Sequence, residues 1–186
     1  MKGFLWGVMA TIVSAVLVAL FVGWTGRVSM RADILPSSFE SNLAMRVMDA
    51  NVERNAPKVT NPVEATAANL VSGASIYRQH CALCHGDPAR PISPLAHTLY
   101  PPPPQFLTDL PDMEENENYY IILHGVRWTG MPGWKNVLED REIWQVVTFL
   151  SNTSHLPPEA KAVFGVTGNS PATPFPMPMK MPKMKM

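Results

Sequence analysis

The chain has 186 residues, of which 46% are hydrophobic, and its acidic and basic side chains are equal in number, so the formal net charge is zero. That length leaves room for one domain with extensions. A neutral chain gives no indication of a nucleic-acid partner. The 19 prolines gather at residues 101–104 and from residue 157 onward, which is typical of loops and tails rather than of a large regular core.

The first predicted element is a membrane-spanning helix. Lys2 is followed by 22 uncharged residues that end at Trp24, and as a helix they would be about 33 Å long, enough to cross a hydrocarbon core of about 30 Å. Trp6 and Trp24 lie near its ends, where aromatic rings favour the membrane interface. The alternative is a cleaved signal peptide, but its apolar core is usually about 7–15 residues long. We therefore expect residues 1–25 to be an uncleaved transmembrane anchor.

Residues 26–62 are predicted to form a connector that contains one amphipathic helix. Ser37 or Ser38 can cap its start, and Ala56-Pro57 should end it. Apolar residues recur along it at helical spacing, namely Leu43, Val47 and Ala50. We expect a solvated spacer, and a helix lying on the surface of the next domain is the alternative.

The run Cys81-Ala82-Leu83-Cys84-His85 carries the most specific chemistry in the chain. Two thiols three positions apart, followed at once by an imidazole, are typical of a c-type haem attachment site. The thiols of Cys81 and Cys84 can add to the two vinyl groups of one haem, and His85 can supply the proximal iron ligand. A thioredoxin-like pair would need a βαβ pattern, which the sequence lacks, whereas a disulfide or half of a zinc site stays open. We predict one covalently bound haem c.

Two helices are predicted to cross beside this site, in a domain that spans residues 63–155. Thr66 should cap a helix from Ala67 to His80 that leads directly into the cysteines. A mid-helix glycine costs about 1 kcal/mol relative to alanine, but it allows another helix to approach closely. The second helix is predicted at residues 138–150. We expect a crossing that brings Gly73 and Tyr77 of the first helix against Val146 and Phe149 of the second.

Met131 is the predicted sixth ligand of the iron. It lies 46 residues beyond His85, at the centre of a loop with two glycines and a proline that can approach a flat cofactor closely. His124 is the rival ligand. Arg127 and Trp128 precede the loop, and either side chain can donate to a haem propionate. A solvated arginine and a core tryptophan are the alternatives for these two residues.

The combination of CALCH, GVRWTGMPGW and EIWQVVTFL resembles class I cytochrome c over about residues 65–152. It is similar to the membrane-anchored monohaem cytochromes of bacterial respiratory chains and to the haem modules of oxidase and dehydrogenase cytochrome subunits. The resemblance implies an all-α class I cytochrome c fold. It also implies that a proline-leucine element, best matched by Pro94-Leu95, supplies a backbone carbonyl that orients His85. The prolines that follow Tyr100 are expected to form a rigid wall of the haem crevice or a polyproline II turn.

Axial ligation by His85 and Met131 would leave no place for a substrate, so we predict an electron carrier rather than an enzyme. The carrier would be tethered to the bacterial inner membrane with its haem domain in the periplasm, where it would pass electrons between respiratory partners such as a membrane dehydrogenase and a terminal oxidase. A fixed cytochrome subunit of a larger membrane complex is the alternative, followed by a haem-based enzyme or sensor. Residues 63–155 carry ten acidic and five basic side chains, which can steer a basic redox partner.

The C-terminal segment, residues 156–186, is predicted to be a disordered tail because it loses hydrophobic periodicity and is rich in proline. It ends in FPMPMKMPKMKM. Closely spaced thioethers suit Cu(I), and an unstructured basic tail is the simpler expectation.

Overall fold

The computed structural model describes residues 2–32, 34, 36–96 and 98–165. It divides into two compact units, Met1–Leu35 and Pro36–Met186. Within the described residues the regular structure is helical and contains no strand, so the predicted all-α class is confirmed. The elements are α1 Lys2–Trp24, α2 Ser38–Asn55, α3 Ala67–His80, α4 Ala82–His85, α5 Glu115–His124, α6 Asp140–Ser151, a 3₁₀ turn Thr153–His155 and α7 Pro158–Phe164.

The first unit is built on α1, which begins and ends close to the predicted positions. The helix is long and apolar enough to cross a membrane, and none of its most apolar window is buried against other parts of the unit. An apolar helix that buries none of its side chains needs a lipid environment or a partner. Its length and composition therefore indicate a membrane anchor, although a signal sequence near the N-terminus shares both properties.

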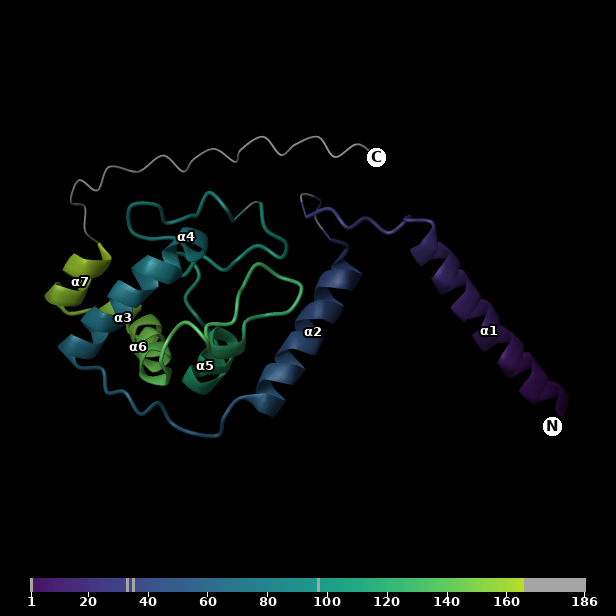
Figure 1. Ribbon diagram of the computed structural model, residues 1–186, viewed down its shortest axis with the longest axis horizontal. Coiled ribbons are helices and arrows are strands. Elements are labelled where there is room, and N and C mark those ends of the chain that lie inside the picture. Colours follow the sequence, from purple (N-terminus) through teal and green to yellow (C-terminus); the bar gives the residue numbers. More distant parts are fainter. Residues whose placement is uncertain (1, 33, 35, 97, 166–186) are drawn as a thin grey trace. The chain divides into compact units, whose positions relative to one another are not determined.

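The second unit is organised around the crossing of α3 and α6, which lie together with α7 in Figure 1. Thr66 caps α3 by accepting a hydrogen bond from the Asn69 amide. A Cβ atom at Gly73 would come within 2.7 Å of the Phe149 Cβ and closer still to a backbone carbonyl of α6. The rings of Tyr77 and Phe149 pack with their centroids 5.3 Å apart. The crossing brings Gly73 and Tyr77 against Phe149, as the sequence predicts, and only glycine permits it.

A Gly73→Ala substitution should therefore destabilise the second unit. The added methyl would force the two helices apart, and overpacking of this kind costs about 1–3 kcal/mol, which outweighs the helix-propensity gain of about 1 kcal/mol. Denaturant unfolding of the haem-loaded protein measures the effect. Gln79→Ala, an exposed change on the same helix, should stay within about 0.5 kcal/mol of the wild type. Equal stabilities for the two variants would contradict the close crossing.

The helix α5 lies between α6 and α2 (Figure 1). On one side, the Tyr119 ring stacks on Trp144 with centroids 4.1 Å apart, and its hydroxyl donates to the Asp140 carboxylate. The starts of α5 and α6 each carry a capping box, in which two glutamates three residues apart each accept a hydrogen bond from the other's backbone amide. These contacts fix the start and the middle of α5, whose other end, at His124, leads into the methionine loop.

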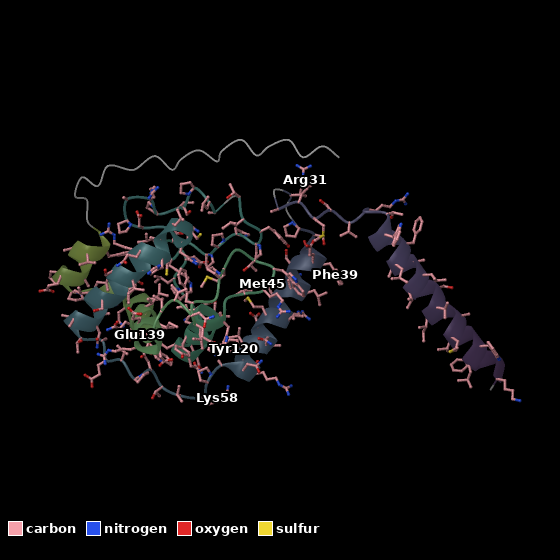
Figure 2. The ribbon with its side chains drawn as sticks, viewed as in Figure 1. Arg31, Phe39, Met45, Lys58, Tyr120 and Glu139 are labelled. Carbon is pink, nitrogen blue, oxygen red and sulfur yellow. The ribbon has the colours of Figure 1, made fainter. Side chains whose placement is uncertain are left out.

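The helix α2 is partly packed, which differs from the solvated spacer that we expected. Val52 is buried on its inner face, and Asn116 of α5 donates to the Pro57 carbonyl at 3.0 Å. The Tyr120 hydroxyl donates to the Asn51 side chain at 3.4 Å, and Figure 2 labels this tyrosine. The predicted apolar stripe faces outward instead: the exposed residues include Leu43, Val47 and Ala50.

The packed chain also continues beyond residue 155, where we expected a disordered tail. Pro158 begins α7, a position that proline suits because its missing N–H would have no partner there. Ala160 and Phe164 of this helix are buried, and Phe164 packs edge-on against Tyr77 with ring centroids 5.6 Å apart. The prediction of disorder is therefore wrong for residues 158–164. The remaining tail and its methionines, at residues 166–186, lie outside the described residues.

Candidate functional site

The two cysteines and His85 lie on one short turn that continues directly from α3. Cys81 ends α3, and its carbonyl accepts hydrogen bonds from the amides of Cys84 and His85 at 3.0 and 2.9 Å. This turn is α4, and it places the two thiols one helical turn apart. Both cysteines are free thiols. Gly86 then reverses the chain with φ 82°, a conformation that favours glycine.

Burial keeps the thiols and the imidazole of this turn uncharged. It raises the pKa of Cys81 to about 12, with a further contribution from the charge of Cys84, and it also raises the pKa of Cys84. It lowers the pKa of His85, although a hydrogen bond to the Pro104 carbonyl opposes this effect. At neutral pH the imidazole is therefore neutral, which is the form that binds iron.

One tautomer of His85 is selected by its surroundings. Its Nδ1 lies 2.9 Å from the Pro104 carbonyl oxygen, which can only accept a hydrogen bond. The proton therefore lies on Nδ1, and the Nε2 lone pair is available to a metal. The ring of Phe106 stacks on the imidazole with centroids 4.6 Å apart and planes 9° apart, which fixes the ring plane.

The carbonyl that orients His85 is not the predicted one. The prediction placed this role on Pro94, whereas Pro104 provides the acceptor. Pro94 is exposed and belongs to a turn whose Ser93 binds the Leu83 carbonyl instead. Of the residues in this arrangement, Pro104, Gln105 and Phe106 were missed as site residues, although the proline block was predicted as a wall of the crevice.

The methionine loop is held against the end of α5 by backbone hydrogen bonds. The Val126 amide donates to the Met131 carbonyl at 3.1 Å, and the Met131 amide donates to the Thr129 hydroxyl at 3.0 Å. The loop closes where the Trp134 amide donates to the Ile122 carbonyl at 3.1 Å. Met131 itself is half-buried and packs against the hydrophobic core.

Two glycines make this closure possible. Gly125 has φ 69°, and a Cβ atom there would lie 2.5 Å from the Gly133 amide nitrogen. A Cβ atom on Gly133 would in turn lie 2.7 Å from the His124 carbonyl oxygen. The loop can therefore return to the helix only because both positions lack side chains.

The other predicted ligands and donors lie mostly at the surface. Trp128 is 91% exposed and has φ 61°, so the alternative of a core tryptophan is wrong. Arg127 and His124 are both exposed. The centroid of the His124 ring lies 4.7 Å from that of the Tyr120 ring. The propionate contacts of Arg127 and Trp128 stay predictions. The His80 ring packs against the Trp134 ring with the ring centroids 5.0 Å apart.

The sequence comparison decides the nature of this site. Residues 68–150 match the family model described as cytochrome C oxidase, cbb3-type, subunit III. This segment is a class I c-type cytochrome domain. The cytochrome domain binds haem c covalently, and the paired thiols of Cys81 and Cys84 beside a neutral His85 fit that group. Among the described residues, no group of three or more histidine, cysteine or acidic side chains is arranged to hold a metal ion by itself.

A solved structure is similar to part of the chain. It belongs to the reducing HAO-like protein complex of Kuenenia stuttgartiensis, with 24% sequence identity and a TM-score of 0.42. The match covers 50% of this chain and 48% of that chain, so it spans about half the length of each. A search of curated proteins finds no match.

Proposed function

We propose that this chain is a membrane-tethered electron carrier. In this proposal α1 anchors the protein, and the cytochrome domain holds one haem between His85 and Met131. The match of residues 68–150 to a cytochrome family carries the proposal, together with a His85 imidazole whose Nδ1 is already hydrogen-bonded. When bound, the haem supplies a one-electron couple at its iron.

The chain's own residues suit electron transfer rather than catalysis. Met131 sits in a loop fixed by backbone hydrogen bonds, and His85 is fixed by Pro104 and Phe106. If His85 and Met131 both hold the haem iron, they would leave no open position for a substrate, and they would not need to move when one electron is gained or lost. A thioether ligand also raises the reduction potential relative to a second histidine.

Stopped-flow oxidation of the full-length protein tests this role. The reduced protein in detergent should transfer one electron to ferricyanide in a single fast phase. With dioxygen or hydrogen peroxide in excess, it should show no catalytic consumption. Sustained turnover of either oxidant would contradict the carrier and favour a haem enzyme.

We place the cytochrome domain on the periplasmic side of a bacterial inner membrane. Covalent haem attachment takes place on that side, and the apolar α1 has the length needed to span the membrane. Protease added to spheroplasts should remove the haem-staining domain from the membrane. Protection from the protease until the membrane is lysed would contradict this placement.

A fixed subunit of a larger oxidase or dehydrogenase is the second candidate. The description of the matching family favours it, because that family is named for a subunit of an oxidase. In either case the partners are redox proteins. Native gel electrophoresis of solubilised membranes separates the two: a free carrier should migrate alone, and a subunit should migrate with large partner chains.

A further inference from the structure

The proline block that orients His85 lacks the usual means of holding a loop in place. Residues 101–104 are all proline and have no backbone N–H, so they cannot donate the hydrogen bonds that normally fix a loop. The position of the Pro104 carbonyl, on which His85 depends, must be fixed by other groups.

The Gln105 side chain supplies this support. Its amide nitrogen donates to the Pro103 carbonyl at 2.8 Å and to the Cys84 carbonyl at 3.0 Å. Its amide oxygen accepts from the Ser93 backbone N–H at 2.7 Å. Two acceptors and one donor face the amide, so only one orientation of the group satisfies all three.

A buried serine extends this support to the other side of the turn. Ser93 is 1% exposed, and its hydroxyl donates to the Leu83 carbonyl at 2.5 Å. The same oxygen accepts from the Leu95 amide at 3.0 Å. The carbonyls of both residues that precede His85 are thus bound, one by Ser93 and one by Gln105.

These bonds join the two segments that carry the donor and the acceptor of the His85 hydrogen bond. Cys84 is adjacent to the donor, His85, while Gln105 is adjacent to the acceptor, Pro104. The Gln105–Cys84 hydrogen bond therefore lies one residue away from the His85–Pro104 hydrogen bond in both segments. We call Gln105 a clamp because its side chain holds these two segments together. We propose that Gln105, supported by Ser93, is a positioning residue that sets the reduction potential of the haem through the His85–Pro104 hydrogen bond.

The direction of the effect follows from ligand chemistry. A short hydrogen bond from Nδ1 makes the imidazole a stronger electron donor, which favours oxidised iron. Loosening the clamp should weaken that bond and raise the potential. This inference rests on His85 ligation in the proposed function and does not depend on the identity of the sixth ligand.

Gln105→Met tests the clamp, because methionine has a similar length but cannot make these hydrogen bonds. The variant should favour reduction by about tenfold, which for a one-electron couple is about 59 mV upward. Solvent exchange of the His85 Nδ1 proton, followed by NMR of the loaded protein, should become faster. Gln79→Met is the matched control, since Gln79 is exposed and its side-chain amide bonds to the Ser75 hydroxyl; it should change neither quantity.

An unchanged potential and an unchanged proton exchange rate in folded Gln105→Met would overturn the proposal. If that variant yields no folded holoprotein, Ser93→Ala decides in the same way, since it removes only the hydroxyl bonds to Leu83 and Leu95. It should shift the potential upward by a smaller amount, and no shift would overturn the proposal. Carbon monoxide binding by the wild type would reject Met131 ligation and leave this test intact.

Discussion

Replacing His85 with alanine should abolish a stable haem-loaded protein. The cysteines alone can still form thioether bonds, but the iron loses its proximal nitrogen, and the Pro104 carbonyl and the Phe106 ring lose the imidazole they hold. We expect the yield of holoprotein to fall by at least about tenfold, because loss of a metal ligand costs more than the 10–100-fold typical of its supporting groups. Haem staining on a denaturing gel, normalised to total protein, measures this yield.

His155→Ala is the matched control for this experiment. His155 is exposed in the 3₁₀ turn and lies outside the site described above. Its loss should leave holoprotein yield close to that of the wild type. A normal yield and a normal low-spin spectrum for His85→Ala would show that another side chain binds the iron, and the assignment of His85 would fail.

Replacing Met131 with alanine should leave the haem attached but open the iron. The thioether bonds to Cys81 and Cys84 do not depend on the methionine loop, so holoprotein should still form. Loss of the thioether should lower the reduction potential, because that ligand favours reduced iron. We expect a change of at least tenfold in the redox equilibrium, which is about 59 mV for one electron, together with new binding of carbon monoxide.

The control for this change is Met45→Ala, on the exposed part of α2 labelled in Figure 2. It should alter neither the potential nor ligand binding. An unchanged potential in Met131→Ala would instead point to a different sixth ligand. His124 is the first candidate, and the double variant Met131→Ala, His124→Ala would then show the opening that the single variant lacks.

The crossing of α3 and α6 could be predicted from the sequence because its signals are local. Gly73 lies eight residues before Cys81, and Tyr77 lies four residues before Cys81. The apolar stripe of α6 is regular. Each signal specifies one face of one helix, and two such faces can be matched directly. The haem attachment turn is similarly local, since its three reacting groups lie within five consecutive residues.

The carbonyl that binds His85 could not be predicted in this way. Every residue has a carbonyl group, so its identity depends on the path of the chain rather than on residue type. Pro94-Leu95 was the best match to the family's pattern, yet the Ser93 and Gln105 bonds bring the later proline block to the imidazole. The sequence does show that residues 101–104 lack backbone N–H donors. Such a block cannot pair as a regular helix or strand, so its carbonyls are left to accept hydrogen bonds from side chains.

The errors at α7 and α2 have a different origin. The prolines from residue 157 onward predicted a tail, but Leu156, just before α7, and Ala160 and Phe164 within it recur every four residues and are all buried. In α2, the spacing of the apolar residues predicted the helix but not which face packs. Val52 is buried although the stripe that contains Leu43 is exposed, since packing depends on the contacts that α5 offers.

The absorption spectrum of the reduced wild-type protein, recorded with and without carbon monoxide, tests the central claim most directly. With His85 and Met131 both bound, the iron has no vacant position and the spectrum should not change. Ready formation of a carbon monoxide complex would contradict axial ligation by Met131. An enzyme or ligand sensor would then explain the site better than an electron carrier.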